Sequence, residues 1–187
     1  MTNKKRILFI TGTRADFGKL KPLINATNST EHFNALIFVT GMHMLRKYGS
    51  TWEEVNKSNL GSISTFINQN DTDQMDSILA KTISGLSDFV KEESPDLIVI
   101  HGDRLEALAG AIVGAFNNIR VAHIEGGEIS GTLDEIVRHS ISKMSHFHFV
   151  SNMSSRNRLL QMGEHLSRIH VIGSPEVDVM KSDLLPS

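Results

Sequence analysis

Three segments combine glycine with charged side chains directly after short apolar runs. They read TGTRADFGK at residues 11–19, HGDRLE at residues 101–106 and HIEGGE at residues 123–128. Glycine permits tight turns and a close approach of a ligand to the backbone. Carboxylates can transfer protons at such places, and arginine can bind a phosphate through its planar guanidinium. The pattern therefore indicates acid–base chemistry beside an anion-binding site.

The first segment fits neither common nucleotide-binding motif. It lacks the Gly-x-Gly-x-x-Gly spacing of dinucleotide-binding proteins, and five residues, rather than four, separate Gly12 from Gly18. Leu20 also stands where a Walker A loop has Ser or Thr. What remains is a helix N-terminus with Arg14 and Lys19 nearby, which suits an anion. An ordinary turn with solvated basic side chains is the alternative.

The second and third segments carry acidic side chains. Asp103 can cap a helix that begins at Arg104, whereas Arg104 suits phosphate and is expected at the same sheet edge as Arg14. His123 and Glu125 would share one face of an extended segment. Because apolar strand ends surround it, burial is expected to raise the pKa of Glu125 and favour proton transfer. An ion pair between Glu125 and a neighbouring Arg or Lys is the alternative.

A fourth segment begins a predicted helix after residue 131. Thr132 and Glu135 have the spacing of a capping box, which places Asp134 in the first helical turn, where negative charge is favourable. Asp134 and Arg138 can pair across one turn, as can Glu135 and His139. From the local pattern alone, capping is therefore the favoured interpretation of this segment.

A metal site is the other chemistry that these residue types could support. Five histidine and acidic positions are candidates for one such site: 101, 103, 123, 125 and 134. However, no His-x-x-x-His or equivalent pair falls on a predicted helix, and the chain has no cysteine. We therefore expect no metal ion.

The elements that must position these residues alternate between strands and helices. Continuous apolar runs, typical of strands covered on both faces, lie at Ile7–Ile10, Ala35–Val39, Leu97–Ile100, Arg120–Ile124, Phe147–Val150 and His170–Ile172. Helical patterns lie at Asp73–Glu93, with Asp73 as cap, and at Leu105–Asn117, Leu133–Met144 and Ser151–Met162. Residues 41–64 have no clear assignment, and a weak helix is expected at Val177–Lys181. The alternation predicts an α/β fold with a doubly wound parallel sheet.

Composition excludes several classes of function. The 187 residues are 40% hydrophobic and 21% charged, as in globular proteins, and the net charge of -2 argues against nucleic-acid binding. The apolar run after Lys4-Lys5-Arg6 is too short for a secretory signal, and no run reaches the length of a membrane span. Together with the absence of cysteine, these features predict a cytoplasmic protein without a membrane partner.

Taken together, the motifs resemble the hydrolysing UDP-N-acetylglucosamine 2-epimerases, in the branch that serves sialic-acid-type and legionaminic-acid sugars. The resemblance rests on residues 12–19, 101–104, 123–128 and 130–143, in this order, and extends over essentially the whole chain. It covers the first half of the family's usual length. It implies one half of a glycosyltransferase-B arrangement, in which two Rossmann-like domains face each other across a cleft. Residues 1–173 would form the N-terminal domain and residues 174–187 the start of the linker, with the second domain absent.

The resemblance also implies a reaction and roles for particular residues. The enzyme would remove the proton at sugar C2, expel UDP to give a glycal and add water, yielding N-acetylmannosamine and UDP without a metal or other cofactor. By motif position, the catalytic residues would be Asp103, Glu125 and Asp134, with Glu125 and Asp134 as the proton-transfer pair. Three basic side chains would contact UDP: Arg14, Lys19 and Arg104. The full-length protein is expected to be a homo-oligomer, and the isolated chain to be inactive.

Three alternatives remain open at this point. The segment GSPEVD at residues 173–178 resembles the legionaminic-acid branch, whose epimerases take UDP-N,N′-diacetylbacillosamine. A non-catalytic module that binds a nucleotide sugar or a partner chain would explain the length. A nicotinamide-dependent oxidoreductase rests on the fold class alone, and the missing glycine fingerprint counts against it.

Overall fold

A computed structural model describes residues 4–175 and 177. The strands in this part of the chain are β1 (Lys5–Thr11), β2 (Phe33–Val39), β3 (Ser62–Thr65), β4 (Leu97–His101), β5 (Arg120–Ile124), β6 (Phe147–Val150) and β7 (Ile169–Val171). The α-helices are α1 (Arg14–Asn28), α2 (Trp52–Lys57), α3 (Met75–Glu93), α4 (Leu105–Phe116), α5 (Leu133–Lys143) and α6 (Met153–Gln161). Short 3₁₀ turns occupy Gly41–Met44, Arg46–Tyr48 and Leu166–Arg168.

The strands form one parallel sheet in the order β3-β2-β1-β4-β5-β6-β7. From β1 the chain winds outward through β2 and β3, and then returns to β4 on the other side of β1. The strand order therefore reverses between β1 and β4. In doubly wound sheets this reversal opens a crevice at the carboxyl ends of the strands, where ligands bind.

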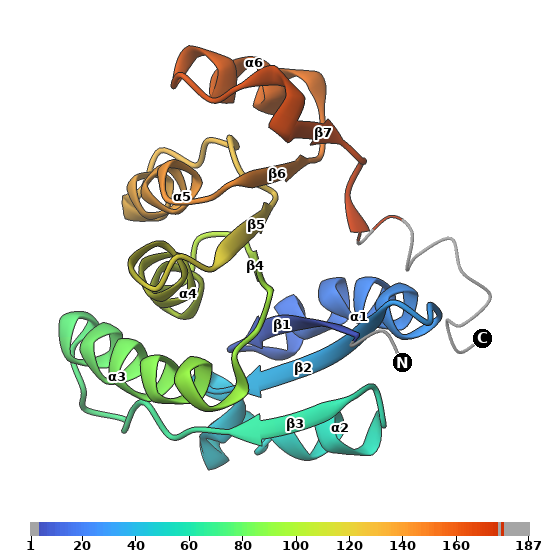
Figure 1. Cartoon of the computed structure of the whole chain (residues 1–187). Coiled ribbons are helices and arrows are strands. Elements are labelled where there is room, and N and C mark those ends of the chain that lie inside the picture. Colours follow the sequence, from blue (N-terminus) through green and yellow to red (C-terminus); the bar gives the residue numbers. More distant parts are fainter. Residues whose placement is uncertain (1–3, 176, 178–187) are drawn as a thin grey trace.

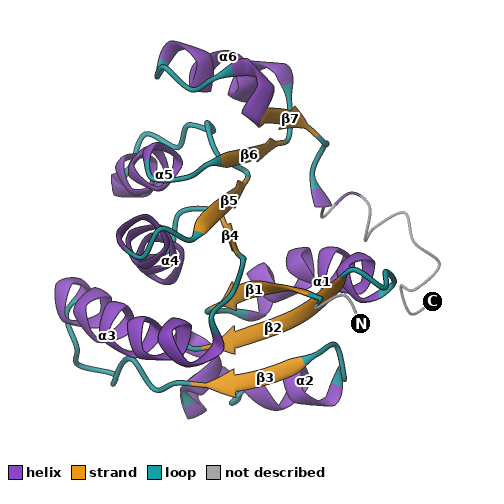
Figure 2. Cartoon of the chain, in the orientation of Figure 1, coloured by secondary structure: helices purple, strands orange, loops and turns teal. Residues whose placement is uncertain are grey.

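Helices cover both faces of the sheet, as Figures 1 and 2 show. On one face, apolar side chains of α3, α4 and α5, such as Leu86, Ala111 and Ile141, pack against alternate residues of the central strands. On the other face, Phe17 and Leu20 of α1 pack with β1 and β2. The α6 helix packs at the edge formed by β6 and β7. The predicted fold class, an α/β protein with a doubly wound parallel sheet, is confirmed.

The apolar runs predicted the strands because both sheet faces are buried. The bounds of β5 and β6 match the prediction, and β1, β2, β4 and β7 differ from it by a few residues. The strand that the sequence did not reveal is β3, which lies at the sheet edge and reads SIST. Its polar, half-exposed residues lack the apolar run that marks the inner strands.

The predicted helices α3, α4, α5 and α6 are present, with small shifts at their ends. The predicted cap at Asp73 is wrong, because α3 begins after Gln74 and Asp73 instead accepts hydrogen bonds from Asn70 N and Lys81 Nζ. Apart from Val177, the predicted helix Val177–Lys181 lies outside the described residues, as does most of the predicted linker.

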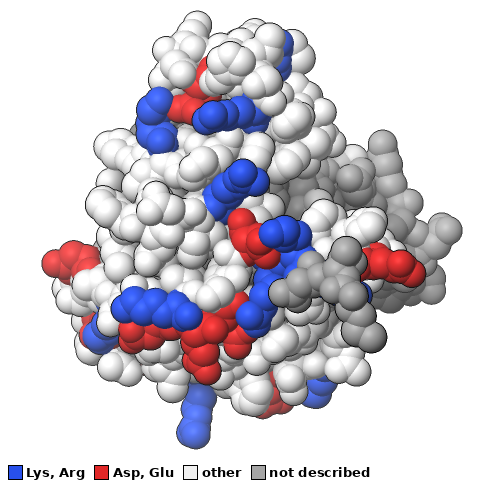
Figure 3. Space-filling view, viewed as in Figure 1, with Lys and Arg blue, Asp and Glu red and all other residues white. Residues whose placement is uncertain are grey.

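The surface of the described residues carries charges of both signs. Figure 3 shows acidic and basic side chains lying next to one another on the viewed face rather than in one basic patch. Within the described part of the chain, no helix is both long enough and apolar enough to traverse a bilayer.

Candidate active site

A pocket of about 230 Å³ lies at the carboxyl ends of β1, β4 and β5, where the strand order reverses. The start of α1, the turn after β4, the residue after β5 and one side chain of α5 supply its lining. Four of the six predicted site residues line it: Lys19, Asp103, Arg104 and Glu125. The other two do not: Arg14 and Asp134.

Three side chains contact the Glu125 carboxylate in the pocket. Its Oε2 lies 3.1 Å from Lys19 Nζ and 2.9 Å from His101 Nε2, and its Oε1 accepts a hydrogen bond of 3.2 Å from Ser174. Burial alone would raise the pKa of Glu125, but His101 and Lys19 outweigh burial and lower it from 4.5 to about 2. The expectation of a raised pKa is therefore wrong for this structure, and the predicted alternative, an ion pair with a basic side chain, is confirmed.

His101 is a site residue to which sequence reasoning gave no role of its own. It ends β4, and only a tenth of its side chain is exposed. Because the Glu125 carboxylate is ionised, His101 Nε2 must carry the hydrogen of their 2.9 Å hydrogen bond. Its position in the HGDR motif, next to the predicted turn, was the signal that could have identified it.

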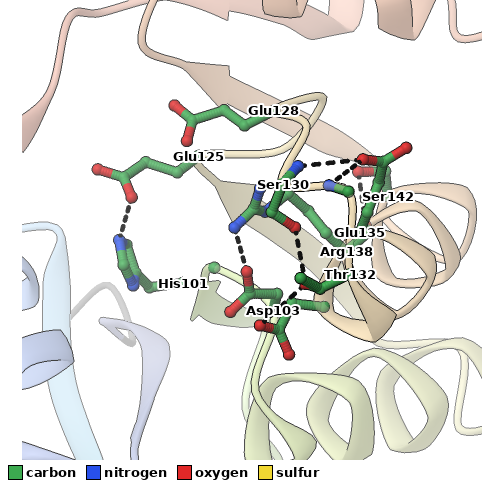
Figure 4. Close-up of polar contacts among 12 residues, drawn as sticks. His101, Asp103, Glu125, Glu128, Ser130, Thr132, Glu135, Arg138 and Ser142 are labelled. Atoms are coloured by element: carbon green, nitrogen blue, oxygen red, sulfur yellow. Dashed lines mark hydrogen bonds and ion pairs between the residues drawn. The ribbon is translucent and has the colours of Figure 1, made fainter.

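Asp103 pairs with Arg138, and Figure 4 shows the two side chains meeting between the turn after β4 and α5. Asp103 does not cap α4, because the residue at the cap position is Arg104 and no side chain bonds there. The predicted pairing of Arg138 with Asp134 is also wrong, since the guanidinium binds Asp103 instead. Arg138 was not among the predicted site residues.

Asp134 lies apart from the pocket at the exposed start of α5. Its carboxylate contacts Thr132 Oγ1 at 3.3 Å. The predicted capping box is not formed, because the Thr132 side chain makes no cap hydrogen bond. Glu135 instead reaches further back and accepts from the backbone N–H groups of Ser130 and Gly131, as Figure 4 shows.

The two predicted arginines differ in their surroundings. Arg14 is largely exposed and pairs with Glu54 of α2. Arg104 lines the pocket, and its Nε lies 3.4 Å from Glu106 Oε2. Neither of these two buried atoms has a hydrogen bond among the described residues. Arg104 thus lies in the pocket beside Glu106, whereas Arg14 lies outside it and pairs with Glu54.

His123 does not enter the pocket. It is fully buried, and its ring bonds Gly102 O at 2.7 Å and Ser142 Oγ at 3.0 Å. The expectation that it shares an extended face with Glu125 fails because the strand ends at Ile124 and Glu125 has a φ of 61°. Burial lowers the pKa of His123 to about 3, so its ring is neutral.

Two other features bear on what the chain can bind. A larger pocket of about 560 Å³ lies beside α1 on the sheet face, and its lining is apolar except for Thr27 and Thr30 and has no titratable side chain. Among the described residues, no group of three or more His, Cys, Asp or Glu side chains is placed to hold a metal ion. The pocket around Glu125 is lined by ionisable side chains, which are groups that acid–base chemistry requires.

The fold is Rossmann-like and matches one half of the glycosyltransferase-B enzymes. It superposes on a crystal structure of the Neisseria meningitidis UDP-GlcNAc 2-epimerase bound to UDP-GlcNAc with a TM-score of 0.84 at 23% identity, over 94% of this chain and 47% of that one. The galactosyltransferase WaaB shares the fold with a TM-score of 0.63 at 14% identity, over 90% of this chain and 45% of that one.

A sequence model of the family described as UDP-N-acetylglucosamine 2-epimerase matches residues 25–185, and the chain belongs to this family. It is 53% identical over 183 residues to the UDP-N-acetylglucosamine 2-epimerase of Neisseria meningitidis serogroup B, covering 98% of the chain and 48% of that protein. It is 40% identical over 178 residues to the hydrolysing UDP-N,N′-diacetylbacillosamine 2-epimerase of Legionella pneumophila, covering 93% of the chain and 47% of that protein. The chain thus spans about half the length of these curated relatives.

Proposed function

We propose that the chain is the N-terminal half of a hydrolysing UDP-N-acetylglucosamine 2-epimerase, which converts UDP-N-acetylglucosamine and water into N-acetylmannosamine and UDP. The observation that carries this proposal is an ionised carboxylate, Glu125, beside Lys19 and Arg104 in one pocket at the reversal of the sheet. Such a pocket supplies a proton acceptor together with cations that can stabilise a departing diphosphate. Family membership and the 53% identical meningococcal relative support the choice of reaction.

The chemistry divides into elimination and hydration. In the first step a base takes the proton from sugar C2, the electron pair forms the C1–C2 double bond, and the C1–O bond breaks to release UDP. In the second step water adds its oxygen to C1 of the glycal, and a proton returns to C2 from the opposite face. Atoms balance as UDP-sugar plus water giving free sugar plus UDP, and no electrons are exchanged with a cofactor.

The state of Glu125 suggests its role in this sequence. Because its pKa lies near 2, Glu125 is ionised in the free chain and enters the reaction as a proton acceptor. A carboxylate stabilised so strongly is a weak base. We infer that bound substrate loosens the contacts from Lys19 and His101, which raises the basicity of Glu125 at the moment of proton transfer.

The other roles follow from position. Asp134 is proposed as the second proton-transfer group, and Asp103, held by Arg138, as an orienting group. Arg104 and Arg14 are proposed to contact the diphosphate. Residues 1–173 would form the N-terminal domain, and the remaining residues would begin the linker.

The test joins this chain, after Ser187, to the C-terminal half of the meningococcal relative. Release of UDP and free sugar is measured with UDP-N-acetylglucosamine, and in D₂O the N-acetylmannosamine formed should carry deuterium at C2. Glu125→Gln and Asp134→Asn should each abolish most turnover, whereas Glu53→Gln on the surface of α2 should not. Turnover retained in both site variants would defeat the assignment of residues.

The 40% identical Legionella relative favours an alternative substrate, UDP-N,N′-diacetylbacillosamine. UDP-N,N′-diacetylbacillosamine differs from UDP-N-acetylglucosamine at C4 and C6, so the ratio of kcat/KM for the two sugars decides between them. The isolated 187-residue chain is assayed beside the joined protein. If the 187-residue chain and the joined protein both bind UDP and neither turns over a UDP-sugar, a nucleotide-sugar-binding module is favoured instead.

A further inference from the structure

One buried side chain connects the loops that carry the proposed site without touching the pocket itself. His123 is fully buried in β5, and neither of its ring nitrogens faces solvent or a charged partner. Its Nε2 contacts the carbonyl of Gly102, the turn residue between His101 and Asp103, and its Nδ1 contacts Ser142 on α5. A histidine in this place links two separate segments of the site.

The direction of both hydrogen bonds follows from the number of protons. A carbonyl can only accept, so Nε2 carries the single ring hydrogen and donates it to Gly102 O. Nδ1 then has a lone pair that faces Ser142 Oγ, whose single hydrogen can be donated either to Nδ1 or to the Arg138 carbonyl. The ring thereby fixes the peptide that leads into Asp103 on one side and α5 on the other.

These contacts close a ring around the Asp103–Arg138 pair. Ser142 lies one turn after Arg138 on α5, and its Oγ lies 3.0 Å from the Arg138 carbonyl. Arg138 in turn binds Asp103, which follows Gly102 directly. Figure 4 shows Asp103 meeting Arg138, which lies on α5 together with Ser142.

Residue 126, in the turn after β5, is a glycine, which leaves room for the His123 ring. A Cβ atom on Gly126 would lie 2.9 Å from His123 Nδ1 and 2.9 Å from Ser142 Oγ. Gly126, the residue next to Glu125, therefore lies close to the contact between His123 and Ser142. The His123 ring thus bonds the segments that carry Asp103 and Arg138, and His123 itself lies in the strand that leads into Glu125.

We propose that His123 is a positioning residue, which holds the Asp103 turn, the Glu125 turn and α5 in register through its neutral, Nε2-protonated ring. Its contribution to turnover rests on the proposed function, but its contribution to geometry does not. The structure offers a matched control in His148, which is also fully buried, lies opposite His123 in the β5–β6 pairing and bonds Glu164 instead of the site.

The first experiment uses the 187-residue chain and needs no activity. ¹⁵N NMR of histidine-labelled chain should find His123 as the neutral Nε2–H tautomer from pH 5 to pH 8. His123→Phe should shift the amide resonances of Asp103 and Arg138 more than His148→Phe does, since His148 contacts neither the Gly102 turn nor Ser142. An Nδ1–H tautomer, or equal shifts in both variants, would overturn the proposal.

The second experiment measures kinetics on the joined protein described above. His123→Phe should lower kcat on the order of 100-fold, as a small misplacement of reacting groups does, with KM changed less than about threefold. His123→Gln, whose amide N–H can replace Nε2–H toward Gly102, should recover most of kcat. His148→Phe should leave kcat within about threefold, and an equal loss there would contradict the proposal. If the unsubstituted joined protein is inactive, the proposed function fails and the NMR result alone decides the role of His123.

Discussion

Replacing Glu125 by glutamine tests the electrostatics of the pocket directly. The substitution keeps the size and shape of the side chain but removes the charge that Lys19 and His101 stabilise. A pKa that lies near 2 in the folded chain, against an ordinary value of 4.5, corresponds to about 3 kcal/mol of folding free energy at neutral pH. We therefore expect Glu125→Gln to lower the free energy of unfolding at pH 7 by about 3 kcal/mol.

The sign of the pH dependence follows from the depressed pKa. The stabilisation by ionised Glu125 is fully present above pH 4.5 and is lost as the pH falls toward the folded-state pKa near 2. The difference between the unsubstituted chain and Glu125→Gln should thus stay near 3 kcal/mol from pH 7 to pH 5. It should shrink to about 2 kcal/mol at pH 3.5.

Urea denaturation followed by circular dichroism, at a series of pH values between 3.5 and 7, measures this difference. Glu53→Gln is the control, because Glu53 is exposed and lies 3.8 Å from Lys57, a surface pair worth less than about 1 kcal/mol. A Glu125→Gln variant as stable as the parent at pH 7 would refute the reasoning. A difference that does not diminish on acidification would refute it as well.

Two further predictions concern packing and pairing around the same pocket. Gly126→Ala should destabilise the chain by ~1–3 kcal/mol in urea titrations, because its Cβ would collide with the buried ring of His123. Gly18→Ala, inside α1 with no atom within 4 Å of the new Cβ, should instead stabilise it by ~0.5–1 kcal/mol. In a double-mutant cycle, Asp103→Asn and Arg138→Leu should couple by ~0.5–3 kcal/mol, and strict additivity would show that their ion pair contributes nothing.

The fold could be predicted where burial on both faces leaves a clear pattern. Residues 120–124 and 147–150 form strands with the predicted bounds, because most of their side chains are apolar and partly or fully buried. The same logic fails for Ser62–Thr65, since an edge strand that is half exposed tolerates polar residues. Helix starts were less predictable than helix interiors: Asp73 has the right residue type for a cap, but it bonds Lys81 and the loop backbone instead.

The site was predictable to the level of the sheet edge, because parallel strands bring their carboxyl ends together. That rule correctly placed Lys19, Asp103, Arg104 and Glu125 around one pocket. The choice of partners was not predictable from spacing. Arg138 lies four residues from Asp134, yet packing of α5 against the turn after β4 directs its guanidinium to Asp103.

The two carboxylates proposed for proton transfer are prepared to different degrees in this chain. Glu125 is enclosed and held by three side chains, whereas Asp134 is exposed and its carboxylate contacts Thr132 Oγ1. The apolar side chains of Leu133 and Ile136 next to it are more than half exposed as well. Proton transfer to carbon is favoured by exclusion of water, and nothing in the described residues excludes water from Asp134. If Asp134 acts as proposed, whatever excludes water from it lies outside the described residues, whereas Glu125 should already be ionised in the isolated chain.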